Sequence, residues 1–340
     1  MAILPEADPI LVVGAARSGT TLLQRLLDAH PNLSVLDEMT YFNGIVQLRS
    51  AVPDMAAPGA VERFFALLPK LDQYPYWNGM EDIFAETRRR LLAEAQPSYE
   101  KFYLFAMRAH AARGGKRRYG DKTPENVRSL DELAAIFGRM QVLHIVRDPR
   151  ANVASRKATE WSSADVVTNT LKWRLDVTAA RRFAATAPAD RFLQLHYEDL
   201  VTDPAAVLTR VCAFLGEEFS PRMLEAHQRQ DALFRNSSWK DNALRPVSTE
   251  SVARWRSTLT RGQIGLVQAA AGAALQEHGY APEKLSPADW LRAGLRAPVE
   301  VGRWLRFKLA RKPMTPGAEF HAGSADLWRS LRRSLGLGGR

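Results

Sequence analysis

The sequence contains one cysteine, Cys212, among its 340 residues. A single thiol excludes an internal disulfide framework and any metal site built from several cysteines. Because Cys212 lies in an apolar stripe with helical spacing, we expect a buried structural thiol rather than a nucleophile. No apolar run reaches the length of a membrane-spanning helix, and the N-terminus lacks the basic start and long apolar segment of a signal peptide. The sequence therefore predicts a cytoplasmic location.

Acidic residues are scarce toward the C-terminal end of the chain. Residues 287–340 hold 11 of the 47 basic residues and 4 of the 37 acidic ones, so they carry +7 of the net charge of +10. Positive charge of this size favours anionic partners. Because the charge is concentrated in one terminal segment and no recognisable nucleic-acid-binding motif is present, nucleic acid is not expected as a partner.

Short apolar runs alternate with helical patterns before this basic segment. The alternation predicts an α/β fold, in which a P-loop-like parallel sheet is flanked by helices on both faces. Residues 40–113 mix helical patterns with proline, glycine and aromatic clusters, as in a mainly helical insertion that covers a site. We expect one domain over 1–286 and a basic amphipathic tail over 287–340. Strands are predicted at residues 9–13, 32–36, 119–124, 140–146 and 192–197, and a last core helix at 262–278.

A glycine-rich loop follows the first predicted strand. Residues 14–21 read Gly-Ala-Ala-Arg-Ser-Gly-Thr-Thr and open onto a leucine-rich helical pattern. Strand, glycine loop and helix in this order form a phosphate cradle, because loop N–H groups and the positive end of the helix converge there. The spacing is that of a nucleoside triphosphate P-loop, but Thr20 stands where that motif has Lys, and the cation is Arg17 inside the loop. The loop therefore predicts a different phosphorylated donor.

Polar residues also fall where other predicted strands end. Glu38, Lys122, Arg147 and Tyr197 each lie at such an end. Since ligands of open parallel sheets bind at the carboxyl ends of the strands, we expect these side chains to share one site with Arg17. Three cations at successive strand ends indicate a polyanionic ligand.

Arg147 and Ser155 form a second candidate phosphate anchor. Ser155 follows eight residues after Arg147, about two turns into the next predicted helix. The guanidinium offers a fixed fork of donors that suits phosphate, and the serine adds a hydroxyl donor. The alternative is a local ion pair between Arg147 and Asp148, with Ser155 as a neutral surface residue.

Together these motifs resemble those of the sulfotransferase family that uses 3′-phosphoadenosine 5′-phosphosulfate. Residues 14–23 are similar to its 5′-phosphosulfate loop, in the arginine-containing form of protein-tyrosine sulfotransferases and many bacterial members. Residues 147–155 resemble its 3′-phosphate motif, and residues 196–204 resemble a later strand–helix unit that lies near the nucleotide. The resemblance covers residues 10–255. The chain departs from the cytosolic small-molecule members, which carry Lys in the loop and a catalytic His.

The resemblance implies which residues bind the donor and release adenosine 3′,5′-bisphosphate as product. Residues 18–21 would hold the 5′-phosphosulfate, and Arg147 with Ser155 the 3′-phosphate. A basic segment at 245–247, preceded by Ser237, Ser238 and Lys240, would close over the donor. The implied donor-binding residues are Arg17, Ser18, Gly19, Thr20, Thr21, Arg147, Ser155, Tyr197 and Arg245.

The same resemblance implies three catalytic residues. Arg17 would stabilise charge on the oxygen that bridges phosphate and sulfonate, and Lys122 would supply a second cation at the sulfonate. The acceptor hydroxyl must lose a proton, so a base is needed within hydrogen-bond reach. We favour Glu38 on its position, with Asp37 as the alternative base. No metal is expected, because the cations come from side chains.

Two other functions are compatible with these residues. A P-loop kinase would need Mg²⁺, a loop lysine and a strand-end aspartate, and this chain lacks the lysine and offers only Asp148 as a poor metal ligand. A non-catalytic, membrane-associated protein of the same fold is the second rival. For a sulfotransferase, the acceptor remains open among a small molecule, a lipid or glycolipid, and a protein tyrosine.

The tail interleaves apolar and basic residues over 290–312 and again over 327–335. Basic amphipathic helices with tryptophan lie on anionic membrane surfaces, so one prediction is peripheral contact with the inner membrane surface. The alternative is that the helices dock on the enzyme itself or on a second subunit of a homodimer.

Overall fold

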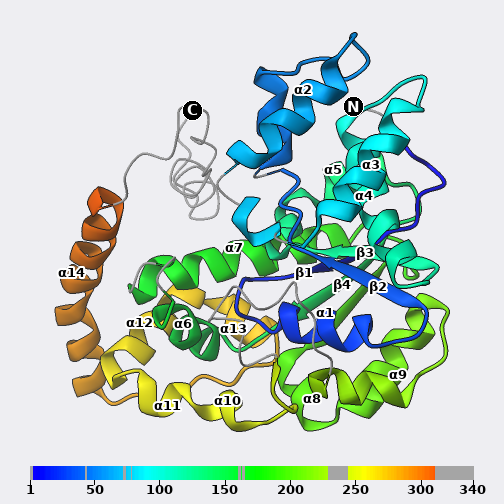
Figure 1. The fold of residues 1–340 in the computed structure, drawn as a ribbon. Helices are drawn as coiled ribbons and strands as arrows, with labels where there is room; N and C mark the ends of the chain where they lie inside the picture. The colour runs from blue at the N-terminus through cyan, green and yellow to red at the C-terminus, as the bar shows by residue number, and fades with distance from the viewer. Residues whose placement is uncertain are drawn as a thin grey trace. The chain divides into compact units, whose positions relative to one another are not determined.

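The computed structural model describes residues 3–42, 44–71, 74–77, 79–159, 162, 165–228 and 244–310. The chain divides into two compact units, a first unit of Met1–Arg147 with Asp176–Ala253 and a second unit of Asp148–Leu175 with Arg254–Arg340. The strands are β1 (Ile10–Val13), β2 (Leu33–Asp37), β3 (Arg118–Lys122), β4 (Gln141–Val146) and β5 (Phe192–His196) (Figure 1). The longer helices are α1 (Thr20–Asp28), α2 (Ala60–Leu67), α3 (Glu81–Leu92), α4 (Tyr99–Arg113), α5 (Leu130–Ile136), α6 (Pro149–Lys157), α7 (Val166–Ala184), α8 (Tyr197–Thr202), α9 (Pro204–Leu215), α12 (Arg261–Ala271) and α14 (Pro287–Ala310).

The first unit is built around a parallel sheet of five strands in the order β2-β3-β1-β4-β5. The chain runs from β1 outward to β2 and later returns to the other side of β1 to form β4. The strand order therefore reverses between β1 and β4, which is the place where open α/β sheets bind their ligands. The loop 14–21 follows β1, and Arg147 follows β4 directly.

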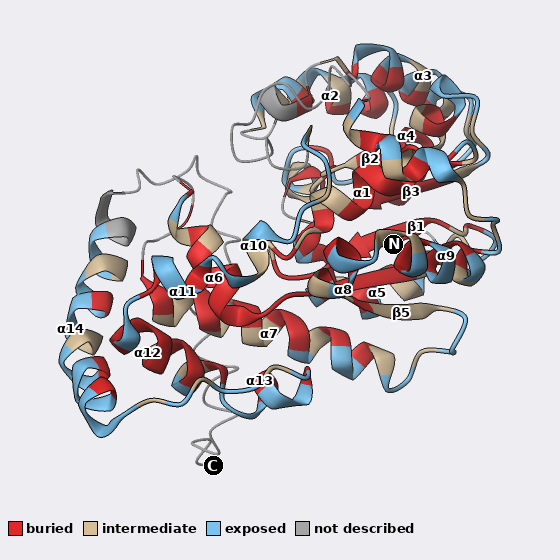
Figure 2. Cartoon of the chain, turned by 90° about the horizontal axis from the view of Figure 1, so that it is seen from below, coloured by how far each residue is buried: buried red, intermediate tan, exposed pale blue. Residues whose placement is uncertain are grey.

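Alternate residues of β1 enter two separate cores, because successive side chains of a strand point to opposite faces. Ile10 and Val12 pack with leucines of α1 and with α8 and α9. Leu11 and Val13 pack with α4, α5 and the last turns of α7. Figure 2 shows β1, β3 and the adjoining α1 as largely buried. The predicted parallel sheet with helices on both faces is confirmed.

Between β2 and β3, the described residues form only helices and turns, among them α2, α3 and α4. This confirms the predicted mainly helical insertion over 40–113. Aromatic side chains fill its interior, with Phe64 packed edge-on against Tyr99 and Phe102 at centroid distances of 5.4 and 4.8 Å. Cys212 is buried in α9, and burial raises the pKa of its thiol to about 11. Its expected structural role fits this environment.

The second unit contains α6, the first half of α7, and α12 to α14 around a small core that includes Val153, Trp255 and Ile264. α12 begins with a capping box, in which Thr260 and Gln263 exchange hydrogen bonds between side chain and backbone. The predicted single helix over 262–278 is wrong. Gly272, at φ 57°, separates α12 from α13 (Ala273–Glu277), because its backbone leaves the helical conformation.

No helix among the described residues is both long enough and apolar enough to cross a membrane. The cytoplasmic location predicted from the sequence stays a prediction.

Replacing Gly120 by alanine is expected to lower the free energy of unfolding by about 1–3 kcal/mol. Gly120 lies in β3 beside β1, and a Cβ there would stand 2.2 Å from the backbone oxygen of Ile10. Two paired strands would have to separate to admit the methyl group. Denaturant unfolding of the purified variant measures the loss. Gly114→Ala is the matched control, because its nearest neighbour would be the flexible Lys116 side chain at 3.5 Å, and an equal loss there would contradict the explanation.

Candidate active site

The loop after β1 leads into a helix whose N-terminus has no side-chain cap. Gly19 is the N-cap residue of α1 and has no side chain to cap the helix, and the first turn contains no acidic residue. The first N–H groups of a helix have no partner within the helix. An uncapped end of this kind attracts an anion through these N–H groups and through the helix dipole.

Gly19 is required at its position by two independent features. Its φ of 97° lies in the left-handed region that side chains disfavour. A Cβ on Gly19 would also stand 2.3 Å from the ring of Tyr197. Tyr197 follows β5 directly and is the first residue of α8, a helix not expected from the sequence, so the ring reaches the loop from the far side of β4.

Arg147 holds the loop and Tyr197 in a fixed arrangement. Its guanidinium donates through Nη1 to the carbonyl oxygen of Arg17 at 3.1 Å and through Nη2 to that of Ser251 at 2.8 Å. It also lies over the Tyr197 ring, 4.2 Å from the ring centroid, while the Tyr197 hydroxyl meets the Ser251 hydroxyl at 2.5 Å. Ser251 lies in α10 (Glu250–Ala253), a segment in which the sequence offered no signal. The structure thus brings Arg17, Gly19, Arg147 and Tyr197 together.

A second cluster forms where β2 and β3 end. Lys122 is fully buried, and its Nζ pairs with Asp37 Oδ1 at 2.6 Å and with the carboxylate of Glu38. The sheet register explains the contact, because Asp37 and Lys122 are paired residues of neighbouring strands. Burial alone would lower the pKa of Lys122, but the two carboxylates more than offset it and hold that pKa well above its ordinary value. Lys122 therefore remains charged.

The two carboxylates differ in their access to solvent. The Glu38 side chain is 38% exposed, whereas that of Asp37 is 11% exposed. The Glu38 backbone is fixed on both sides, because its N–H donates to the Lys122 carbonyl at 2.9 Å and its carbonyl accepts from Trp77 Nε1 at 3.0 Å. Of the two, Glu38 is thus the carboxylate more open to an incoming molecule.

Arg17 and Glu38 share an uncommon backbone conformation. Both are non-glycine residues in the left-handed region, with φ of 73° and 47°. Such positions are strained by about 1–3 kcal/mol and persist where surrounding contacts determine them. Arg147 fixes the carbonyl of Arg17, and Lys122 with Trp77 fixes the backbone of Glu38. Strain of this kind gathers at functional sites.

Asp121 contacts the chain next to the second cluster and was not singled out from the sequence. Its buried carboxylate accepts from the backbone N–H of Met39 at 3.1 Å and from the Tyr103 hydroxyl at 2.8 Å. Burial raises the pKa of Asp121 to about 6, although these hydrogen bonds and Lys122 act in the opposite direction. The bond to Met39 anchors the chain immediately after Glu38.

Several residues named in the sequence analysis belong to other elements of the chain. Ser155 lies in α6 of the second unit and is half-buried, so its joint use with Arg147 stays a prediction. Asp148 caps α6 by accepting from the Arg150 N–H at 2.8 Å, and its carboxylate also pairs with the Arg150 guanidinium at 2.7 Å. Arg245 is exposed. The residues expected before it, Ser237, Ser238 and Lys240, lie outside the described residues.

Comparisons with known proteins give a consistent result. The model of the sulfotransferase family matches residues 9–221. Protein-tyrosine sulfotransferase A of Caenorhabditis elegans is 24% identical over 286 residues, which cover 82% of this chain and 68% of that protein. Carbohydrate sulfotransferase 5 of Mus musculus is 25% identical over 324 residues, which cover 82% of each chain. The solved sulfotransferase domain from the curacin biosynthetic pathway has the same fold, with a TM-score of 0.57 and 18% identity over 83% of this chain and all of that domain.

The chain belongs to the sulfotransferase family, since the family match spans more than half of its length. The predictions of a sulfotransferase and of its fold are thereby confirmed. The chain spans about two thirds of the length of the protein-tyrosine sulfotransferases of Caenorhabditis elegans, Gallus gallus and Danio rerio that it matches.

Proposed function

We propose that the protein transfers a sulfonate group from 3′-phosphoadenosine 5′-phosphosulfate to a hydroxyl group of an acceptor. The observation that carries the proposal is the N-terminus of α1, whose N-cap residue is a glycine and whose first turn has no acidic side chain. Arg17 lies in the loop before this helix, and its carbonyl accepts a hydrogen bond from Arg147 at the end of β4. A donor with phosphate groups at two positions needs two anion sites. The loop supplies one of them, and the motif at 147–155 is the candidate for the other.

The residues of the loop fit the 5′-phosphosulfate. The N–H groups at the start of α1 and the hydroxyls of Thr20 and Thr21 would bind its oxygens, and Ser18 lies buried inside the loop. Arg147 and Ser155 would bind the 3′-phosphate, with Tyr197 beside the nucleotide and Arg245 closing over it. When bound, the donor supplies a sulfonate joined to its 5′-phosphate through a bridging oxygen.

Glu38 acts as the base in this proposal. It accepts the proton of the acceptor hydroxyl, whose oxygen forms the new bond to sulfur while the bond from sulfur to the bridging oxygen breaks. Negative charge then accumulates on the bridging oxygen of the leaving adenosine 3′,5′-bisphosphate. A fixed cation at that oxygen acts mainly on the transition state, and this role falls to Arg17.

The pairing of Lys122 with two carboxylates suits a second cationic role. Before transfer, Asp37 and Glu38 both oppose its charge. Glu38 loses its negative charge when it takes the proton, and of the two paired carboxylates Asp37 alone still opposes Lys122. The positive charge of Lys122 then becomes available to the sulfonate oxygens at the moment when the base is used.

The acceptor would meet Glu38 next to the helical insertion. Trp77 of the insertion donates its indole N–H to the Glu38 carbonyl, so the insertion touches the proposed base directly. Relatives carry the names protein-tyrosine and carbohydrate sulfotransferase, and both kinds of acceptor present a hydroxyl group. A small molecule, a lipid or glycolipid, and a protein tyrosine are all acceptors of this chemical class.

The donor assignment predicts that adenosine 3′,5′-bisphosphate binds without Mg²⁺ in a calorimetric titration. Arg147→Gln should weaken this binding about tenfold to hundredfold, the range for a lost hydrogen bond to a charged group. Arg139→Gln is the matched control, because Arg139 is an exposed arginine paired only at the surface with Glu6. Binding of Mg·ATP alone would overturn the proposal and favour a P-loop kinase. A screen of hydroxyl acceptors with radiolabelled donor then identifies the acceptor.

A further inference from the structure

Helix α14 of the second unit buries one face against α12. Ala293 and Glu300 are almost without exposed surface, and Glu300 accepts a hydrogen bond from Gln263 of α12 at 3.2 Å. Two glycines of α12 admit the close approach, since a Cβ on Gly262 would stand 3.1 Å from the backbone of Arg292 and one on Gly265 3.2 Å from Ala293. Figure 1 shows α14 lying beside α12. The inward face of α14 is therefore already occupied.

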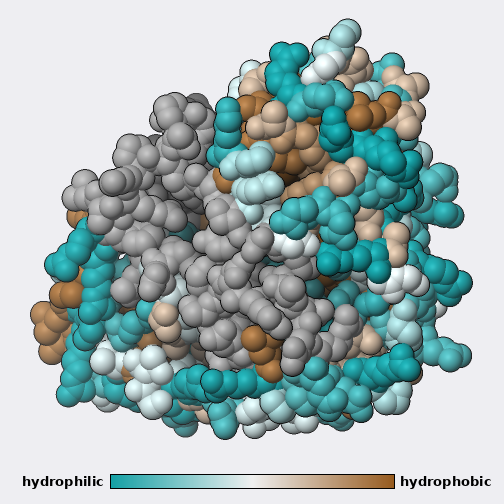
Figure 3. Space-filling view, in the orientation of Figure 1, coloured by the Kyte–Doolittle hydropathy of each residue, from teal (hydrophilic) through white to brown (hydrophobic). Residues whose placement is uncertain are grey.

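The opposite face of α14 is apolar and exposed. Leu291, Leu295 and Val299 follow one another at intervals of four residues and are 66%, 71% and 51% exposed. Residues three and four apart share one side of a helix, so these side chains form a continuous row, the outer stripe. Figure 3 shows hydrophobic residues among hydrophilic ones on the surface of α14. An exposed apolar row of this length marks an interaction site.

The charges of α14 are sorted by sign. Its two acidic residues, Asp289 and Glu300, are 5% and 0% exposed. Each is held by arginines, with Arg292 at 2.9 Å from Asp289 and Arg303 at 3.1 Å from Glu300. Arg292 keeps 66% of its side chain exposed. The helix thus turns its carboxylates inward and leaves cationic groups beside the outer stripe.

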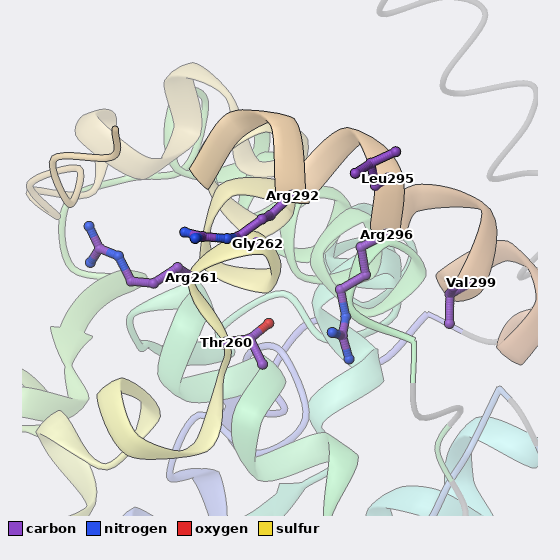
Figure 4. Close-up of a pocket in the computed structure, with 7 residues that line it drawn as sticks. All are labelled: Thr260, Arg261, Gly262, Arg292, Leu295, Arg296 and Val299. Atoms are coloured by element: carbon purple, nitrogen blue, oxygen red, sulfur yellow. The ribbon is translucent and has the colours of Figure 1, made fainter. Parts of the chain in front are cut away.

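An open pocket of about 480 Å³ lies between the start of α12 and α14 (Figure 4). Arg261, Arg292 and Arg296 line it together with Leu295 and Val299 of the outer stripe. In Figure 4, Arg261 and Arg292 extend toward the same side, while Leu295 and Val299 project from α14. The pocket combines cationic donors with apolar surface, which is the combination that an anionic lipid headgroup and the start of its acyl chains require.

We propose that α14 docks the protein on an anionic lipid bilayer. The outer stripe enters the boundary between headgroups and acyl chains, and the arginines bind headgroup phosphates, one of them at the pocket. Charge complementarity selects this occupant. A second copy packed on the same stripe about a two-fold axis would place like-charged arginines against one another. The proposal is independent of sulfonate transfer.

Vesicle sedimentation with the full chain tests the proposal. The protein should pellet with phosphatidylcholine vesicles that contain phosphatidylglycerol and stay in the supernatant with phosphatidylcholine alone. Leu291→Asp/Leu295→Asp should weaken binding at least about tenfold, because it places charge in the outer stripe. Arg292→Gln/Arg306→Gln should weaken it about fivefold for each arginine removed. Leu92→Asp is the matched control, since Leu92 is a 48% exposed leucine of α3 in the first unit, and it should bind as the wild type does.

Thermal unfolding checks that each variant folds, which the exposure of Leu291 and Leu295 leads us to expect. If a folded Leu291→Asp/Leu295→Asp variant bound vesicles as well as the wild type does, the proposal would be overturned. Binding would then come from another part of the chain, such as residues 311–340, which the variant retains. Equal binding to both kinds of vesicle would also overturn it. The outer stripe would be assigned to a second copy of the chain if the wild type did not bind vesicles but formed a dimer, and if this variant were a monomer. None of these measurements depends on sulfonate transfer. A failure of the membrane-docking proposal is therefore distinct from a failure of the proposed function.

Discussion

Replacing Glu38 by glutamine is expected to lower kcat about 10²- to 10⁴-fold, which is the range for loss of a general base. Glutamine has nearly the same shape and can still accept a hydrogen bond from Lys122, but it cannot take the proton of the acceptor hydroxyl. Single-turnover transfer of radiolabelled sulfonate to an acceptor from the screen measures the loss. Binding of adenosine 3′,5′-bisphosphate should change little, because Glu38 lies after β2 and outside the loop that follows β1.

Asp37→Asn is the matched control for this prediction. It removes the other carboxylate of Lys122 and leaves Glu38 in place, so its effect on kcat should be much smaller than that of Glu38→Gln. A larger loss for Asp37→Asn would identify Asp37 as the base. If Glu38→Gln and Asp37→Asn both kept most of their activity, neither carboxylate would be the base. Circular dichroism of both variants checks that they keep the fold, because each variant removes one carboxylate charge from the buried Lys122.

Strands β1 and β4 could be predicted because their residues are largely apolar on both faces. The run 140–146 became β4 (Gln141–Val146), and the run 9–13 became β1 (Ile10–Val13). The order of the strands could not be predicted, because it depends on contacts between residues far apart in the chain. That order places the reversal between β1 and β4, beside the phosphate loop. The break at Gly272 was missed because an alanine-rich pattern continues on both sides of it.

The site could be predicted only as far as its motifs extended. The loop at 14–21 and Arg147 carried recognisable signals. Ser251 and Trp77 did not, because each reaches the site from a segment that is distant in the sequence. The pairing of Lys122 with Asp37 follows from the β2–β3 register and was therefore hidden until the strand order was known.

The left-handed backbones of Arg17 and Glu38 were equally hidden. A non-glycine residue gives no sign in the sequence that it will adopt such a conformation. Arg17 is held there by the hydrogen bond that its carbonyl accepts from Arg147. Glu38 is held by the bond that its carbonyl accepts from Trp77 and by the bond that its N–H donates to the Lys122 carbonyl. These bonds fix the backbone of the proposed leaving-group cation and of the proposed base. The structure thus accounts for two positions of the proposed active site by contacts that lie outside the motifs themselves.

Arg17→Asn should separate catalysis from stability. Loss of the cation at the bridging oxygen is expected to lower kcat about 10²- to 10³-fold, as for removal of one preorganised electrostatic group. Asparagine tolerates the left-handed region better than arginine does, so the free energy of unfolding should stay within about 1 kcal/mol of the wild type. Single-turnover transfer and denaturant unfolding measure the two quantities on the same preparation.

Arg17→Lys completes the comparison, because lysine keeps the charge but lacks the forked donors of arginine. Its kcat should fall between those of the wild type and Arg17→Asn. If Arg17→Asn unfolded much more easily and Arg17→Lys were as active as the wild type, the arginine would serve the fold rather than the leaving group. If both variants kept full activity, the charge on the bridging oxygen would have to be met by another group. Lys122, which loses one of its two paired carboxylate charges once Glu38 is protonated, is the cation that we propose for it.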